Sequence, residues 1–167
     1  MKLRFFSIFA AAALLAACES APESTGTKAA AGTAAPPAAS APKASGIVAG
    51  SEQDFIANVG DRVFFDFDKY SLRDDAKAAL DKQAAWLKKY PAYALTVEGH
   101  CDERGTREYN LALGERRANS VKEYLVAAGL PASRVKTISY GKERPVALGS
   151  NDAAWSQNRR GVTVLSK

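Results

Sequence analysis

Two patterns of hydrophobic and polar positions alternate between residues 51 and 167. Short runs rich in aromatic and β-branched residues are typical of strands, and they lie at residues 62–67, 94–98, 135–139 and 162–165. Between the first three runs, apolar residues recur at every third or fourth position, which predicts two main helices over residues 72–90 and 109–128. Strands that alternate with helices predict an α/β fold in which both helices pack on one face of a sheet.

The ends of the two predicted helices carry sequence signals. Ser71, followed three residues later by Asp74, approximates a capping box at the start of the first helix, and Pro91 ends that helix. Gly129 ends the second helix, and a short helical turn is expected over residues 152–157. The residues predicted to face the core include one polar exception, Gln83, and are Ala76, Ala79, Leu80, Gln83, Leu87, Leu113, Val121 and Leu125.

Residues 1–17 have the pattern of a secretory signal peptide. Lys2 and Arg4 precede an apolar run from Phe5 to Ala17, which is shorter than the stretch of about 20 residues that a membrane-spanning helix needs. The run ends in LAAC, which resembles the lipobox of bacterial lipoproteins, where the cysteine thiol, here that of Cys18, is acylated. Two or more acyl chains would anchor the protein to a membrane without spanning it. The alternative is an ordinary signal peptide that contains a cysteine.

Residues 18–50 have the composition of a disordered linker that follows the lipidated cysteine. Ala, Pro and Ser dominate, as in GTAAPPAASAPKASG, and such a segment buries too little apolar area to offset its ordering entropy. Roughly 30 residues of coil average about 30 Å end to end and reach about 100 Å when stretched. Residues 51–167 have the length of a single domain. The sequence therefore predicts one folded domain on a long tether.

Charges of both signs are interspersed along the chain. The 23 Lys and Arg and 18 Asp and Glu residues give a formal net charge of +5 without a basic stripe, which argues against nucleic acid as a partner. Once Cys18 is lipidated, Cys101 is the other of the two cysteines, so no intramolecular disulfide can form. We expect Cys101 to be partly shielded and chemically idle.

The segment from Glu98 to Ala118 concentrates acids, bases and glycines. It places Asp102 at the C-terminal edge of the second predicted strand, where ligands often bind in α/β sheets. Arg117 lies about two turns into the next helix, and its side chain can point back toward Asp102. Asp68 follows the first strand and reaches the same edge if the two strands are parallel neighbours. Carboxylates facing a guanidinium would complement a ligand that carries both an ammonium and a carboxylate.

The same residues allow other interpretations. Asp102 and Arg117 could pair only with each other and brace the loop. His100, Cys101 and Asp102 offer donor atoms to a metal, but residues at a strand end alternate in direction and the sequence has no second His or Cys cluster. Nothing resembles a set of nucleophile, base and orienting residue. The pattern favours a binding protein over an enzyme, with no metal site and no cofactor.

Four runs resemble the peptidoglycan-associated lipoproteins of Gram-negative bacteria, whose globular part is an OmpA-like domain. They are VFFDFDKYSL at 63–72, EGHCDERGTREYNLALGERRA at 98–118, SYGKERP at 139–145 and NRRG at 158–161. The resemblance covers essentially all of residues 55–167, and the lipobox and linker agree with it. It implies an OmpA-like fold with a βαβαβ-type mixed sheet. Cys101 departs from the family pattern, which has a small residue such as alanine or threonine there.

The resemblance also implies non-covalent binding of the peptidoglycan stem peptide through its meso-diaminopimelate. Asp102 would take the ammonium of this amino acid, and Arg117 would take its carboxylate. Asp68 and Phe67 would line the pocket. Leu113 would pack on the methylenes of the ligand.

Further implications concern location and partners. The family pattern implies an outer-membrane lipoprotein on the periplasmic face, part of the Tol–Pal system, with a role in envelope integrity and cell division. In family sorting rules an Asp after the cysteine signals the inner membrane, and this chain has Glu19 there. The periplasmic protein TolB would bind a surface that overlaps the wall-binding site, so the two would compete. That surface would comprise Glu103, Arg104, Tyr109, Tyr140, Lys142 and Glu143.

Two hypotheses from other classes compete with wall binding. One is a domain that mainly docks TolB and has little affinity for the wall. The other is a cell-wall hydrolase, which the lack of a recognisable catalytic set disfavours.

Overall fold

The computed structural model describes residues 46–167 of the 167-residue chain. The predicted signal peptide, Cys18 and nearly all of the predicted linker lie outside these residues. Within the described part, no helix has both the length and the apolar character needed to cross a bilayer. The predicted domain boundary between residues 50 and 51 stays a prediction.

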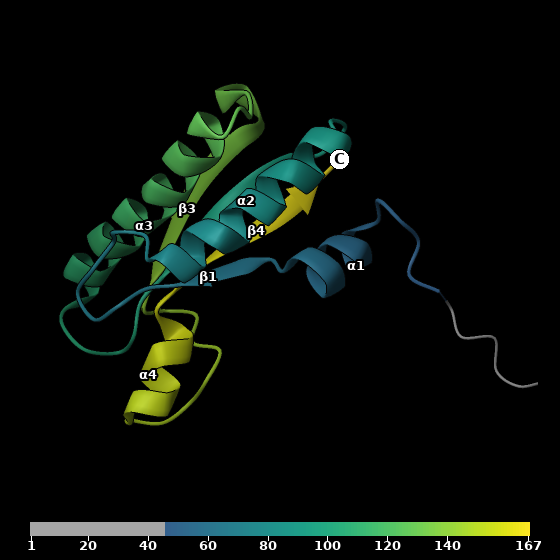
Figure 1. The fold of residues 1–167 in the computed structure, drawn as a ribbon. Coiled ribbons are helices and arrows are strands. Elements are labelled where there is room, and N and C mark those ends of the chain that lie inside the picture. The colour runs from purple at the N-terminus through teal and green to yellow at the C-terminus, as the bar shows by residue number, and fades with distance from the viewer. Residues whose placement is uncertain (1–45) are drawn as a thin grey trace, which may run out of the picture. The chain divides into compact units, whose positions relative to one another are not determined.

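A four-stranded mixed sheet forms the centre of the domain (Figure 1). Its strands are β1 (Arg62–Phe64), β2 (Ala94–His100), β3 (Val135–Gly141) and β4 (Arg160–Ser166). Their order is β1-β4-β2-β3; β2 and β3 are parallel, whereas β4 runs antiparallel to both β1 and β2. The strands β1, β2 and β3 therefore share one direction, and their C-terminal ends lie at the same edge of the sheet.

Two long helices, α2 (Asp74–Lys89) and α3 (Arg107–Ala127), cover one face of this sheet (Figure 1). The short helix α4 (Asp152–Asn158) precedes β4, and a 3₁₀ turn over Ala132–Arg134 precedes β3. These elements confirm the predicted α/β fold, a mixed sheet with two main helices on one face. The helix α1 (Glu52–Asp54), which continues into a π-helical turn over Phe55–Val59, is an addition to the predicted elements.

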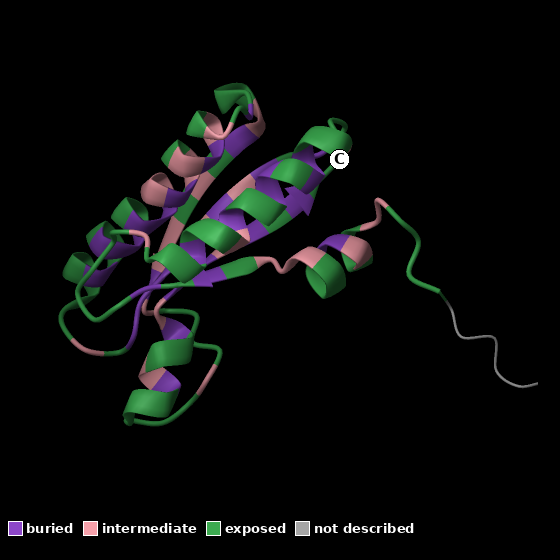
Figure 2. Ribbon diagram, viewed as in Figure 1, coloured by how far each residue is buried: buried purple, intermediate pink, exposed green. Residues whose placement is uncertain are grey.

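The core lies between the sheet and the two helices. Figure 2 shows buried residues along the sides of α2 and α3 that face the strands. The predicted inward residues Leu80, Leu87, Leu113, Val121 and Leu125 are all buried. Burial of the polar Gln83 is accommodated by hydrogen bonds: its Nε2 donates to the Gly60 carbonyl at 2.8 Å, and its Oε1 accepts from Thr163 Oγ1 at 2.9 Å.

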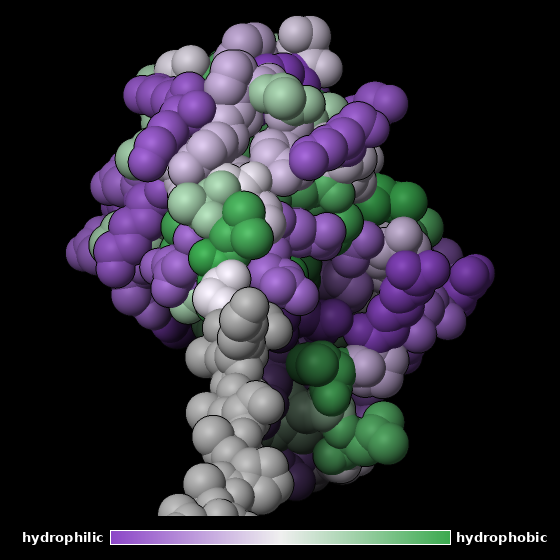
Figure 3. Space-filling view, turned by 90° about the vertical axis from the view of Figure 1, so that its right-hand side faces the viewer, coloured by the Kyte–Doolittle hydropathy of each residue, from purple (hydrophilic) through white to green (hydrophobic). Residues whose placement is uncertain are grey.

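The opposite face of the sheet has exposed apolar side chains. Phe64, Ile138 and Val164 are exposed there, while the alternate residues of each strand point into the core. On the side of the molecule drawn in Figure 3, hydrophilic residues surround smaller apolar areas. One face of the sheet is thus buried against the helices and the other is exposed to solvent, which an antiparallel or mixed sheet tolerates.

The predicted capping box at Ser71 is wrong. The N-cap of α2 is Arg73, whose side chain makes no capping hydrogen bond. Its guanidinium pairs instead with the carboxylates of Asp66 and Asp75. The acidic residues Asp74 and Asp75 occupy the first turn, where their carboxylates interact favourably with the positive end of the helix dipole.

The predicted first strand is too long, and β1 and β2 are not neighbours. β1 ends at Phe64, although the Phe65 N–H still donates to the Arg159 carbonyl at 2.9 Å. The chain then leaves the sheet, and the carbonyls of Asp66 and Lys69 accept hydrogen bonds from Arg117 on α3. Although β4 separates β1 from β2, the shared direction of these two strands still brings Asp68 to the predicted edge.

Candidate functional site

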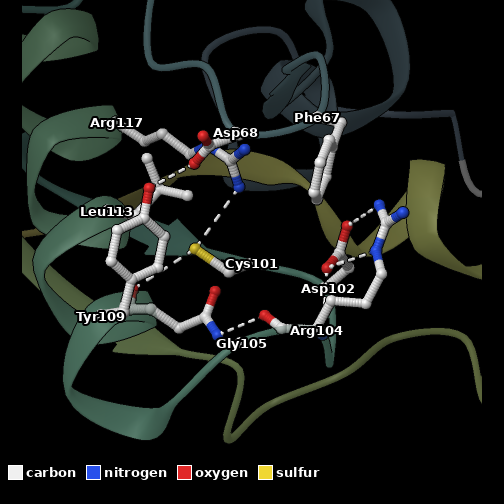
Figure 4. Close-up of a pocket in the computed structure, with 10 residues that line it drawn as sticks. Phe67, Asp68, Cys101, Asp102, Arg104, Gly105, Tyr109, Leu113 and Arg117 are labelled. Carbon is white, nitrogen blue, oxygen red and sulfur yellow. Dashed lines mark hydrogen bonds and ion pairs between the residues drawn. The ribbon is translucent and has the colours of Figure 1, made fainter.

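A cavity of about 180 Å³ opens at the sheet edge where β1 and β2 end. The loop after β1, the loop after β2 and the first half of α3 enclose it (Figure 4). Its lining combines both charge signs with apolar and aromatic surface, and comprises Phe67, Asp68, Cys101, Asp102, Arg104, Gly105, Tyr109, Asn110, Leu113 and Arg117. The five residues predicted to bind the ligand all lie in this lining.

Arg117 is fully buried and is held mainly by backbone carbonyls. Its Nε donates to the Lys69 carbonyl at 2.8 Å, and its Nη1 and Nη2 donate to the carbonyls of His100 (2.8 Å) and Asp66 (3.1 Å). Burial lowers the pKa of the guanidinium below its usual value. Within residues 46–167 Arg117 forms no ion pair, so its charge is solvated by dipoles rather than neutralised by a carboxylate.

Asp102 is also buried, and it has two cationic partners. Its Oδ2 lies 2.6 Å from Arg104 Nη2 and 3.3 Å from Arg159 Nη1, while its Oδ1 accepts from Arg104 Nε at 3.2 Å. Burial raises the pKa of Asp102, but the hydrogen bonds from Arg104 and Arg159 outweigh burial and leave the pKa below its usual value. The alternative in which Asp102 and Arg117 brace the loop by pairing with each other is wrong, because each has other partners.

The loop between β2 and α3 is fixed by the buried side chain of Asn110. Its Nδ2 donates to the carbonyls of Arg104 at 2.7 Å and Thr106 at 2.9 Å. Thr106 is the N-cap of α3, and its hydroxyl accepts from the Tyr109 N–H. Gly105 between them has φ +89°, which disfavours a side chain. These contacts position Asp102 and the start of α3 against the cavity.

Cys101 lies under the cavity and is buried, which confirms the expected shielding. Its Sγ donates to the Asn110 carbonyl and accepts from Arg117 Nη1, both at 3.4 Å. Burial raises the pKa of the thiol to about 11. The group therefore stays protonated and is a poor nucleophile at neutral pH.

The outer part of the cavity is less buried. The Tyr109 hydroxyl donates to Asp68 Oδ1, which links α3 to the loop after β1. Phe67 is 56% exposed and stands at the mouth, whereas Leu113 is buried in the wall (Figure 4). Asp68 has φ +56°, an uncommon conformation that aspartate tolerates better than most residues.

The other residues predicted for a partner surface lie at the ends of β2 and β3: Glu103 follows β2, Tyr140 lies on β3, and Lys142 and Glu143 follow β3. Lys142 Nζ donates to the carbonyls of Glu103 (3.0 Å) and Gly105 (2.7 Å), which ties the loop after β3 to the loop after β2. Glu143 pairs with Arg107 at 3.2 Å. The ring of Tyr140 lies 5.5 Å from that of His100. Together with Arg104 and Tyr109, these side chains occupy the same edge of the molecule.

Asn110, Arg159 and Trp155 are residues of the site that the sequence predictions do not name. Arg159 pairs with Asp102 and also donates from Nε to the Phe65 carbonyl at 3.0 Å. Trp155 of α4 packs on Arg104, with 4.1 Å between its ring centroid and the guanidinium carbon. Arg159 belongs to the NRRG run that contributes to the family resemblance, but the sequence did not assign this residue a role. Nothing in the sequence spacing connects Trp155 to residue 104. Within the described part, no group of three His, Cys, Asp or Glu residues could hold a metal ion.

Comparisons with known proteins agree with this fold. Residues 64–159 match the model of the OmpA family. A protein of Rhizobium meliloti named peptidoglycan-associated lipoprotein is 65% identical over 116 residues, which cover 70% of this chain and 66% of the relative. A protein of the same name from Brucella melitensis is 61% identical over 117 residues, 70% of each chain. The chain thus spans just under two thirds of the first relative's length.

Solved structures show the same architecture. The crystal structure of the peptidoglycan-associated lipoprotein from Burkholderia pseudomallei aligns with a TM-score of 0.65 at 41% identity, covering 68% of this chain and 98% of that one. The C-terminal domain of Helicobacter pylori MotB aligns with a TM-score of 0.60 at 21% identity, covering 64% of this chain and 84% of that one. The second likeness concerns the fold alone.

Proposed function

Because this chain belongs to the OmpA family, we propose that it is a non-catalytic lipoprotein that binds peptidoglycan through the cavity beside Asp102 and Arg117. The names of the Rhizobium and Brucella relatives and of the Burkholderia structure support this ligand. The observation that carries the proposal is the buried Arg117, a cation without an ion pair among the described residues that lines a cavity also lined by two carboxylates.

The ligand group that fits this lining carries both charge signs. A carboxylate of the ligand would approach Arg117, and an ammonium would approach Asp102, with Asp68 nearby. The end of meso-diaminopimelate has these two groups on one carbon, and its methylenes would pack on Leu113 beside Phe67. The cavity of about 180 Å³ is smaller than the roughly 300–1,000 Å³ of drug-sized ligand sites. It therefore suits the end of one amino acid rather than a sugar chain.

The N-terminal residues turn this binding site into a tether. In the proposed organisation, residues 1–17 are the signal peptide, residues 18–50 are the lipidated Cys18 and its linker, and residues 51–167 are the binding domain. The acyl chains would hold the protein to the periplasmic face of the outer membrane. Tethering raises the effective concentration of the domain near the wall, so a modest affinity is enough for attachment.

We also propose a second partner, whose binding would exclude the wall. Arg104 and Tyr109 line the cavity, and Lys142 and Glu143 bond to the adjoining segment through the Glu103 carbonyl and Arg107. We assign to TolB of the Tol–Pal system the surface formed by Glu103, Arg104, Tyr109, Tyr140, Lys142 and Glu143. A protein seated there would cover the cavity. Competition of this kind would let the Tol proteins release or load the tether during cell division.

Sedimentation with purified sacculi tests the wall-binding site. We expect the Asp102→Asn variant of the full domain to bind at least about 30-fold more weakly, because a buried charge partner of the ligand is lost. Arg117→Lys should weaken binding similarly, since a lysine cannot reproduce the hydrogen bonds to three carbonyls that hold the guanidinium beside the cavity. Circular dichroism and thermal unfolding check that the variants fold. Folded variants that sediment like the parent would contradict the site.

One observation favours the alternative of a TolB-docking domain with little wall affinity. The carboxylate of Asp102 already has two arginine partners, so a ligand ammonium would have to compete for it. Sedimentation of the isolated domain with sacculi, in the absence of any other protein, distinguishes the two functions. Binding supports the tether, and no binding supports the docking domain.

A further inference from the structure

Arg104 occupies a cation subsite at the mouth of the cavity. Its guanidinium carbon lies 3.9 Å from the ring centroid of Phe67 and 4.1 Å from that of Trp155, so the planar group is in contact with two aromatic rings. Two of its nitrogens bond the two oxygens of Asp102. Figure 4 shows this pair beside Phe67, at one end of the cavity. A carboxylate flanked by aromatic faces is an arrangement that proteins use to hold cations.

The bonds of Arg104 occupy much of the hydrogen-bonding capacity of Asp102. A carboxylate offers about four acceptor positions. Here they receive the Arg104 backbone N–H at 3.1 Å, Arg104 Nε, Arg104 Nη2 and Arg159 Nη1. A ligand ammonium can therefore reach this carboxylate only if one of the two guanidinium groups moves.

Of the two arginines, Arg104 is the more exposed, and its guanidinium has no hydrogen bond that would be lost besides those to Asp102. Its side chain is 32% exposed, and the hydrogen bonds of its guanidinium go only to Asp102. The side chain of Arg159 is 15% exposed and is also bonded to the Phe65 carbonyl. The backbone N–H of Arg104 would keep Asp102 in place after the side chain has left.

We propose that Arg104 is an intramolecular competitor of the ligand's ammonium for the cation subsite of Asp102, Phe67 and Trp155. This inference rests on the proposed wall-binding function and identifies a residue that sets the strength of that binding. The ligand binds only the fraction of molecules in which the guanidinium has left the subsite, so the measured affinity is lowered by that fraction. The same guanidinium can return as the ligand departs, which favours exchange over permanent attachment.

The test compares the binding of free meso-diaminopimelate and of purified sacculi to the parent domain and to Arg104→Ala. We expect Arg104→Ala to bind both about three- to tenfold more tightly, because the subsite no longer has an internal occupant. Arg107→Ala is the matched control: it removes one arginine charge from the same segment, and Arg107 pairs with Glu143 rather than Asp102. The control should bind like the parent.

Tryptophan fluorescence gives a second measurement that separates competition from a structural role. Trp155 contacts the Arg104 guanidinium, while the other tryptophan, Trp86, is buried in the core. In the parent, ligand binding should change the Trp155 emission as one cation replaces another. The ligand-free Arg104→Ala domain should already differ from the parent in emission.

The possible outcomes distinguish this inference from the function on which it rests. If Asp102→Asn loses binding and Arg104→Ala binds equally or more weakly than the parent, the competition is refuted while the site stands. If Asp102→Asn binds as well as the parent, the site itself is refuted, and the competitor role falls with it. Tighter binding by Arg104→Ala and not by Arg107→Ala supports the inference.

Discussion

His100 is a buried titratable residue beside the candidate site. The residue is 1% exposed, its Nδ1 has no hydrogen-bond partner among the described residues, and its Nε2 lies 3.4 Å from Glu98 Oε2. Burial, with the nearby charges of Arg160 and Arg144, lowers its pKa to about 4. The folded state therefore prefers a neutral imidazole over a wide pH range.

This shift predicts a loss of stability in mild acid. Because the pKa in the folded state is below the unfolded value of about 6.5, the stabilisation is complete above pH 6.5 and declines as the pH falls toward 4. We expect the free energy of unfolding to fall by about 2 kcal/mol between pH 7.5 and 4.5 through this residue. Urea unfolding at both pH values measures the change. In His100→Gln the free energy of unfolding should fall less between the two pH values. An unchanged fall would show that groups other than His100 cause it.

The sequence predicted which residues line the cavity, but not which partners their charged side chains have. Strand ends and helix spacing predicted Asp102, Arg117 and Asp68 at this edge of the sheet, whereas Phe67 and Leu113 were predicted through the family resemblance; all five line the cavity. The partner of Asp102 depends instead on side-chain conformations and on loop paths. Arg117 satisfies three carbonyls of distant segments, a set of contacts that spacing in the sequence does not encode.

At the scale of elements, the approach of α3 to β2 determines where Arg117 lies. Gly99 of β2 and Gly114 of α3 are in backbone contact: a Cβ at Gly99 would lie 1.8 Å from the Gly114 carbonyl oxygen, and one at Gly114 would lie 2.3 Å from Ser139 Oγ. Both positions therefore require glycine for close packing rather than for a turn.

Gly99→Ala should separate these elements and destabilise the domain. Since a backbone atom cannot rotate away as a side chain can, we expect a loss of about 3 kcal/mol in the free energy of unfolding. Gly161→Ala is the control, because a Cβ at this glycine of β4 would meet only side chains, the nearest at 3.3 Å. Chemical denaturation of both variants checks the difference. Equal losses would show that the backbone contact is not the cause.

The positions of the helices and strands were largely predictable from the sequence, but the order in which the strands pair in the sheet was not. The strands and main helices lie where periodicity places them, with ends displaced by a few residues. The order β1-β4-β2-β3 puts the last strand of the chain between the first two, a non-local arrangement that local patterns do not contain. The short helix α1 escapes prediction because none of its residues is buried, so it has no apolar pattern. Phe55, which follows it, is buried and packs on Trp86.

At the scale of the whole molecule, the proposed tether makes a prediction about location. A Cys18→Ser variant expressed in Gram-negative cells should lose its membrane attachment, because no acyl chain can be added, and should appear in the soluble envelope fraction. Its purified domain should still sediment with sacculi. Fractionation followed by immunoblotting measures the first result. A Cys18→Ser protein that stays with the membranes would contradict lipid attachment at this residue.

In the proposed tether, the two ends of β2 would face different attachments. Just before its first residue, the Tyr93 hydroxyl donates to the carbonyl of Gly50, where the chain arrives from the N-terminus; just after its last, Cys101 and Asp102 border the cavity. Tension between an outer membrane and a wall would thus run lengthwise along the strands. The interstrand hydrogen bonds would then be loaded in parallel and would have to break together, instead of one at a time. The mechanical lifetime of the domain would be governed by its unfolding rate.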